Sequence, residues 1–233
     1  MKKKNDGNVL KIILIVVLVV AIIFILYNYA TKDDVFNKYK ENKSKNIVYT
    51  YYKDENVNVP YINLKGLAAE KINETIVNKA NDFLKGDNKI TYSFDINGKI
   101  LSLAIQYEDY YDESKYVVFS YDVYNINFYE NKVLSDEDIL NIYNIKKSDV
   151  KPIVEAKFVE FYNELSSKGV YHDECDYSCF LYQRGITKDN YLTDSYYYIK
   201  NGDLYLLKAF KIYSPFREEE YFSTSDFLIQ ITE

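Results

Sequence analysis

The start of the chain carries one long apolar run, whereas later apolar positions recur with short, changing periods. Residues 12–26 are apolar without interruption, and residues 9–29 carry one charge, Lys11. A helix needs about 20 mainly apolar residues to cross a bilayer. Tyr27 and Tyr29 close the segment with the amphipathic rings that collect at membrane interfaces. The pattern predicts a transmembrane helix over residues 9–29.

Lysines at positions 2–4, together with Lys11, indicate how this helix is oriented. Basic flanks tend to stay in the cytoplasm, so we expect residues 1–8 to form a cytoplasmic stub, with the rest outside. A cleaved signal peptide is the alternative. It is disfavoured because the run is long and because Asn28-Tyr29-Ala30 lacks the small residue expected three positions before a cleavage site. We expect an uncleaved, single-pass signal-anchor in the cell membrane, with a stub too short for a signalling domain.

Residues 30–45 are polar without a sustained period and read as a stalk. We expect an extracytoplasmic domain over residues 46–233, with a first part over 46–88 and a second over 89–233. The first part begins with β-branched and aromatic residues at 47–52, which favour a strand.

Further elements of the first part follow from Pro60 and from a change of period. Residues 57–62 surround Pro60, which indicates an extended edge segment. Residues 64–84 place apolar side chains on one helical face, and Gly86 follows as a C-cap, so we expect an amphipathic helix.

Two Asn-Gly pairs predict hairpins in the second part. Asn97-Gly98 separates strands expected at 89–96 and 99–107, and Asn201-Gly202 separates strands expected at 195–199 and 203–213, because Asn-Gly supplies two positive φ angles. Between them, residues 116–129 alternate in one phase up to Val123 and in the other phase afterwards. This change predicts a β-bulge near Val123.

Two helices and a final strand complete the expected domain. Residues 135–138 resemble a capping box that opens a short helix through Tyr143, and a longer helix ends at Ser167. Residues 169–192 read as an irregular excursion, and 225–231 as a last strand. Without regular βαβ alternation, the fold class is α+β: a largely antiparallel sheet packed with about three helices.

The charge of the chain restricts its partners. The whole chain has a net charge of −6, and without the charges of the N-terminal segment, residues 2–11, it is −9. This argues against nucleic acid and anionic wall polymers, and it permits a basic protein partner. Maintaining solubility is the simpler explanation of the acid excess.

The candidate chemistry gathers around two cysteines. Cys175 and Cys179 lie near His172, the only histidine. A disulfide between Cys175 and Cys179 is the preferred interpretation for an oxidising compartment, and free or intermolecular thiols are one alternative. A zinc site with His172 is the other, although its fourth ligand is unspecified. We assign no metal site and no cofactor.

Acidic clusters and tyrosines have simple structural explanations. Acidic residues gather at 108–113, 136–138 and 218–220, where solvated turns and helix capping are favoured over glycosidase or calcium chemistry. The 27 tyrosines, including those at 110–111 and 196–198, suggest sugar stacking, but core positions and compositional bias are favoured. No catalytic residue is assigned.

The order of elements nevertheless resembles a known family. Residues 59–64, Val-Pro-Tyr-Ile-Asn-Leu, lead into the helix with Asn73, and a strand at 121–124 is followed by Leu-Ser-Asp at 134–136 and Ile-Tyr-Ser-Pro-Phe at 212–216. The chain over roughly 46–231 is similar to the ectodomain shared by the lysozyme-sensing anti-sigma-V factor and the N-terminal region of membrane-bound peptidoglycan deacetylases. It departs from that pattern at residues 112–115, where the family often has Gly-Ala-His.

This resemblance implies a membrane-tethered extracytoplasmic binding or sensing domain without catalytic activity. The expected ligands are lysozyme-like proteins, which are basic, or fragments of peptidoglycan. The short stub argues against control of a sigma factor. A cell-wall-active hydrolase and an accessory subunit of a membrane complex remain the alternatives.

Overall fold

The computed structural model describes residues 18–20, 22, 46–84, 88–110, 116–169, 175–187, 191–213 and 227–232. The chain divides into two units, residues 1–43 and 44–233. In the first unit, residues 18–20 and 22 are helical, and the rest of the predicted span over 9–29 lies outside the described residues, as does the stalk before Asn46. Within the described part of the chain, no helix is long and apolar enough to cross a membrane.

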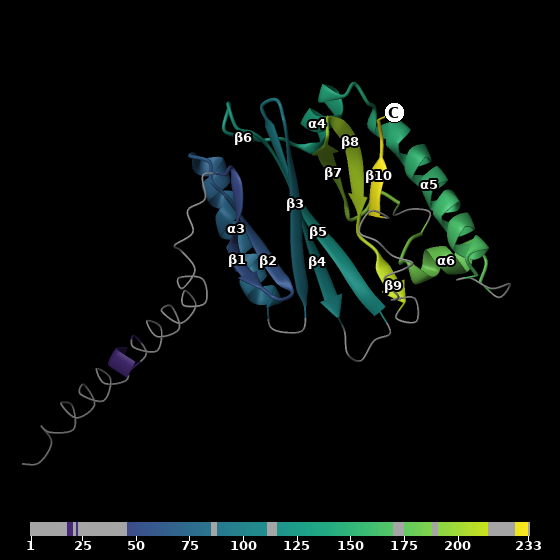
Figure 1. Ribbon diagram of the computed structural model, residues 1–233, viewed down its shortest axis with the longest axis horizontal. Coiled ribbons are helices and arrows are strands. Elements are labelled where there is room, and N and C mark those ends of the chain that lie inside the picture. Colours follow the sequence, from purple (N-terminus) through teal and green to yellow (C-terminus); the bar gives the residue numbers. More distant parts are fainter. Residues whose placement is uncertain are drawn as a thin grey trace, which may run out of the picture. The chain divides into compact units, whose positions relative to one another are not determined.

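The second unit is an α+β fold built on two sheets, and its main sheet is mostly antiparallel, as the sequence predicts (Figure 1). The strands of this first sheet follow the order β1-β2-β3-β4-β5-β6, with β9 also paired to β5. Their bounds are β1 Val48–Asp54, β2 Val57–Ile62, β3 Lys89–Asn97, β4 Ile100–Tyr110, β5 Tyr116–Asn127, β6 Lys132–Val133 and β9 Lys211–Tyr213.

The bulge predicted near Val123 is wrong. β5 pairs with β4 in one continuous register, from Ile100 opposite Asn127 to Tyr110 opposite Val117. The change of phase has another cause, because β5 is covered on both faces. Phe119 faces the second sheet and Ile126 faces the opposite side, and both are buried. A strand buried on both faces can switch its apolar phase without a bulge.

β2 lies between β1 and β3, yet it behaves largely as an edge strand. It pairs with β1 along its whole length but with β3 only through Val57 opposite Ile90, in parallel. Beyond that pair the two strands separate. Pro60, which has no N–H to donate, is tolerated in β2 because no ladder continues there.

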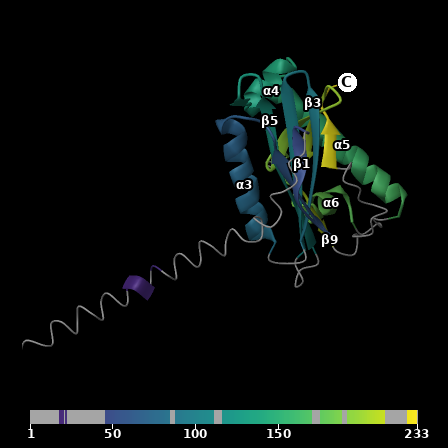
Figure 2. The same cartoon turned by 60° about the vertical axis from the view of Figure 1, so that its left-hand side comes forward.

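The helix α3, Leu67–Phe83, covers one face of the first sheet. It starts three residues later than predicted, so Leu67 is exposed and the buried stripe runs through Ala69, Ile72, Ile76 and Ala80. Figure 2 shows α3 on one side of the sheet and α5 on the other.

Polar contacts fasten α3 to the sheet. The Asn73 side chain accepts a hydrogen bond from the Ile62 N–H at 2.8 Å and donates to the Ile62 carbonyl at 2.9 Å. In this way α3 supplies hydrogen-bond partners for the main-chain groups at the end of β2, where β2 has no neighbouring strand on that side. Lys79 forms an ion pair with Asp122 of β5 at 2.7 Å.

A second sheet of order β10-β8-β7 lies against the other face of the first sheet, with the main core between and around them. Three helices complete this side, and α5 buries Val154, Phe158, Phe161 and Leu165 as predicted. The bounds are α4 Asp136–Ile142, α5 Lys147–Ser167, α6 Tyr177–Gln183, β7 Ser195–Lys200, β8 Asp203–Lys208 and β10 Leu228–Gln230. The helix α6 lies in the segment predicted to be irregular.

The two Asn-Gly hairpins use different turns. Asn201 and Gly202 both have positive φ, 54° and 90°, and join β7 to β8 as predicted. In the first hairpin, Asn97 still pairs opposite Ile100, and the turn consists of Gly98 and Lys99. Only Gly98 has a positive φ, 58°, which is the pattern of a turn with glycine at its first central position.

Candidate functional site

The sequence-predicted cysteine pair lies at the start of α6. A disulfide joins Cys175 to Cys179. Between them, the Asp176 carboxylate caps the helix by accepting a hydrogen bond from the Cys179 N–H at 2.9 Å. His172 lies outside the described residues, and so does the alternative metal arrangement that needs it. Over the described ranges, no three His, Cys, Asp or Glu side chains are grouped to hold a metal ion.

The acidic clusters lie in three different environments. Asp136 and Asp138 belong to the N-terminal turn of α4, where the Ser135 and Asp138 side chains complete a capping box. Glu108 was expected in a solvated turn, and this is wrong, because β4 extends to Tyr110 and buries it. Residues 112–113 and 218–220 lie outside the described residues.

Glu108 is a buried carboxylate with several partners. It accepts a hydrogen bond from the Tyr110 hydroxyl at 2.6 Å and from the Gln106 amide at 3.4 Å, and Lys89 lies 3.4 Å away as its ion-pair partner. Both carboxylate oxygens of Glu108 therefore have partners, at one end of the face that the second sheet covers.

The second sheet meets the first in an unusual way, with one edge of β7 resting on it. Main-chain groups on this edge hydrogen-bond to side chains of the first sheet rather than to another strand. The bonds join Tyr197 O to Asn125 Nδ2 at 2.8 Å, Ile199 N to Ser102 Oγ at 3.0 Å and Asn201 N to Asp95 Oδ2 at 2.5 Å.

These three side chains form one row across the first sheet. Asp95 lies opposite Ser102, and Ser102 lies opposite Asn125, on β3, β4 and β5. The row therefore sets the path of β7, which crosses the strands beneath it. Because the edge of β7 rests on this row, a space remains between the two sheets over the next two cross-strand rows of the first sheet.

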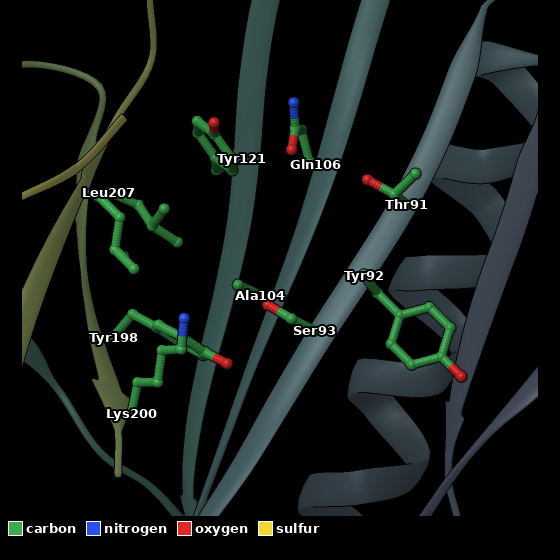
Figure 3. A pocket seen from close by; sticks show the side chains of 10 residues that line it. Thr91, Tyr92, Ser93, Ala104, Gln106, Tyr121, Tyr198, Lys200 and Leu207 are labelled. Carbon is green, nitrogen blue, oxygen red and sulfur yellow. The ribbon is translucent and has the colours of Figure 1, made fainter. Parts of the chain in front are cut away.

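A pocket of about 250 Å³ occupies this space (Figure 3). Its floor is formed by two rows of the first sheet, and its cover by the second sheet. The lining residues are Thr91, Tyr92, Ser93, Ala104, Gln106 and Tyr121 from the first sheet and Tyr198, Lys200, Leu207 and Leu228 from the second.

Short side chains create the hollow. Ser93 and Ala104 are cross-strand neighbours, and neither is long enough to fill the space beneath Tyr198. The Tyr198 hydroxyl hydrogen-bonds the Ser93 side chain, and burial raises the pKa of Tyr198. In Figure 3 the Lys200 ammonium lies among these side chains, whereas the Tyr92 ring lies on the other side of β3.

Tyr121 is the least satisfied polar residue of the pocket. Its side chain is 3% exposed, and its hydroxyl has no hydrogen-bond partner in the described part of the chain. Burial and the nearby charge of Glu108 raise its pKa, so the hydroxyl keeps its proton and can donate. A buried hydroxyl without a partner costs free energy, about 1–3 kcal/mol, which a ligand acceptor would recover.

Sequence reasoning missed this site, although β4 carries a signal for it. Residues 101, 103, 105 and 107 are large and apolar, whereas Ser102, Ala104, Gln106 and Glu108 alternate with them. This pattern usually indicates a strand with one solvated face. Here the polar face is buried under β7, and no local sequence pattern predicts this burial.

Of the predicted tyrosine groups, one contributes to the site. Tyr197 and Tyr198 are buried in β7, and only Tyr198 reaches the pocket. Tyr110 contacts Glu108 instead, and Tyr111 lies outside the described residues. Comparisons with family models, with curated proteins and with solved structures each find no match to this chain.

Proposed function

We propose that this chain is a membrane-tethered extracytoplasmic binding or sensing domain whose ligand occupies the pocket between the two sheets. The apolar run over residues 12–26 supports the tether. The single observation that carries the binding role is the pocket itself, which is lined in part by Tyr121, a residue whose buried hydroxyl has no partner in the described residues. Buried polar groups in natural proteins are nearly always hydrogen-bonded, so this one favours an absent ligand group.

The lining indicates the chemistry of that ligand. Hydroxyls of Thr91 and Tyr121, the Gln106 amide and the Lys200 ammonium supply donors and acceptors, and Leu207 supplies an apolar wall. This mixture suits a group that carries hydroxyls and an amide on an apolar ring, such as an N-acetylated sugar. A volume of about 250 Å³ lies just below the usual range for drug-sized ligands, about 300–1,000 Å³, so one such ring would fill it. We therefore favour a peptidoglycan fragment over a whole protein as the pocket ligand.

A calorimetric titration of the full chain in lipid nanodiscs tests this proposal. Soluble muropeptides and lysozyme are titrated separately, and we expect heat with the muropeptides. Ala104→Leu places a larger side chain on the floor of the pocket and should weaken muropeptide binding at least tenfold. The matched control is Ala156→Leu, the same change at an exposed position of α5.

The outcomes separate the alternatives. No heat with either ligand overturns the proposal, and so does muropeptide binding that Ala104→Leu leaves unchanged. Heat with lysozyme alone, insensitive to Ala104→Leu, would place a protein ligand on another surface. Muropeptides whose masses change during incubation would favour the cell-wall-active hydrolase. Because overpacking can cost about 1–3 kcal/mol, the thermal unfolding of each variant is measured first.

A further inference from the structure

The strand β3 has an open edge beyond the point where β2 leaves it. Along β4, β3 is paired from Lys89 to Asn97. On its other side the only pair in the described ranges is Ile90 opposite Val57. Figure 1 shows β3 running on past β2 and α3. Residues 91–97 therefore have a sheet neighbour on one side only.

The unpaired main-chain groups belong to alternate residues. The Ile90 N–H donates to the Asn56 carbonyl of the β2 side at 3.0 Å, so even-numbered residues of β3 direct their main-chain groups away from β4. Tyr92, Phe94 and Ile96 follow in this phase. Nothing in the described part of the chain hydrogen-bonds their N–H and carbonyl groups on that side. Each of the three offers one donor and one acceptor, at the spacing that a neighbouring strand requires.

β2 cannot fill this position itself. Pro60 has no N–H, and both main-chain groups of Ile62 are already bonded to Asn73. The Tyr92 hydroxyl is hydrogen-bonded to Thr50 at 2.8 Å, which links the N-terminal part of β3 to β1. This link uses the Tyr92 side chain and leaves its main-chain groups unpaired, so the open section runs from Tyr92 to Ile96.

Side chains on the two faces of this edge have different character. On the α3 side, Phe94 and Ile96 are 40% and 39% exposed. Natural edge strands are usually protected by charges or by covering elements, so exposed apolar side chains on an unpaired edge favour a partner that covers them. On the opposite side, Lys200 is exposed and forms no ion pair with the described residues. This lysine complements a negative charge.

We propose that the edge of β3 from Tyr92 to Ile96 binds an extended peptide segment of a partner protein by adding it to the sheet as a strand. Main-chain hydrogen bonds to Tyr92, Phe94 and Ile96 supply the attachment, as in other strand-addition complexes. Apolar residues of the segment lie beside Phe94 and Ile96, and an acidic residue on the opposite face pairs with Lys200. This surface goes beyond the pocket ligand, and the two share Lys200, which also lines the pocket.

Peptide selection and hydrogen exchange test the proposal. Random ten-residue peptides displayed on phage are selected on the full chain in nanodiscs, after subtraction on empty nanodiscs. We expect enriched peptides to alternate apolar and polar residues and to carry an acidic residue. With the best peptide bound, the amides of Tyr92, Phe94 and Ile96 should exchange at least tenfold more slowly by NMR. The amides of residues 91, 93 and 95 face β4 and should not change.

Variants provide the second readout. Phe94→Pro removes one outward N–H without touching the ladder to β4 and should weaken the peptide at least tenfold, whereas Phe94→Val keeps that N–H and should stay within threefold. Lys200→Gln should weaken it about two- to fivefold, as expected for an exposed ion pair. The proposal is overturned if no peptide is enriched, or if the three amides exchange at unchanged rates. Peptide binding that survives Ala104→Leu, while muropeptide binding does not, separates this surface from the pocket.

Discussion

Ser102 and Asn125 lie side by side on β4 and β5, with the Ser102 hydroxyl 2.6 Å from the Asn125 amide oxygen, and together they hold the edge of β7. Ser102 accepts the Ile199 N–H, and Asn125 donates to the Tyr197 carbonyl. All the main-chain groups in this pair of contacts are buried. The contact between the two sheets therefore depends on two short polar side chains in an apolar region.

Removing Ser102 should weaken this junction measurably. Ser102→Ala leaves the buried Ile199 N–H without an acceptor, so we expect a loss of about 1–3 kcal/mol in the free energy of unfolding. Urea unfolding followed by circular dichroism measures it. Ser148→Ala, at an exposed position of α5, should change stability by less than about 0.5 kcal/mol. Equal effects of the two substitutions would contradict the role given to Ser102.

Two buried tyrosines should respond in opposite ways to loss of the hydroxyl. The Tyr107 hydroxyl donates to the Asp122 carboxylate at 3.0 Å, so Tyr107→Phe should lower stability by about 1–3 kcal/mol and leave muropeptide affinity unchanged. The Tyr121 hydroxyl has no partner in the described residues. Tyr121→Phe should leave stability unchanged or slightly raised, and lower muropeptide affinity about three- to tenfold. Thermal unfolding and calorimetry of the same samples give both readouts, and a destabilised Tyr121→Phe would argue for a purely structural hydroxyl.

The capping box of α4 should make stability depend on pH in the acid range. The Ser135 N–H, followed by Lys132 and the Ser135 hydroxyl, lowers the pKa of Asp138 to about 2. A carboxylate with a lowered pKa in the folded state stabilises the protein above its unfolded pKa, about 3.9, and loses this effect as pH falls toward 2. Asp138→Ala should therefore lower the melting temperature at pH 7, and the difference from the parent should shrink between about pH 4 and pH 2. Glu137→Ala, which removes a neighbouring carboxylate outside the capping box, is the matched control. A difference between Asp138→Ala and the parent that stays constant from pH 7 to pH 2 would contradict this explanation.

The disulfide before α6 should contribute modestly to stability. Cys175 and Cys179 are four positions apart, and closing so short a loop corresponds to about 2 kcal/mol of chain entropy in the unfolded state. Cys175→Ser combined with Cys179→Ser should lower stability by about that amount or less. Mass spectrometry of the non-reduced chain checks the bond directly, since two free thiols would contradict it.

Much of the fold could be predicted because local signals are strong in this chain. The capping box at Ser135, the buried face of α5 and the turn at Asn201-Gly202 are each determined within a few residues. The first hairpin was placed correctly, but its turn was shifted by one residue, because Asn97 pairs in the ladder. The helix α6 was missed, since its seven residues are too few to show a period.

The candidate site could not be predicted for a different reason. Ser102, Gln106 and Glu108 alternate with apolar residues as in a strand with a solvated face, and β5 changes its apolar phase as if it were bulged. Both patterns have one cause: the second sheet covers this face, and β7 crosses it along the row Asp95, Ser102 and Asn125. That contact joins residues 72 to 106 positions apart in the chain, a separation beyond the reach of periodicity.

Local sequence was thus sufficient for most of the elements, the α+β class and the expectation of an N-terminal membrane span, because propensity, capping and apolar period act over short distances. Only the tertiary structure decided which polar residues are buried, where Ala104 and Ser93 leave a pocket, and why Tyr121 lacks a partner. It also decided that β2 leaves β3 at Val57, which opens the edge from Tyr92 to Ile96. These features arise where distant strands meet, and burial there is a property of the assembled fold.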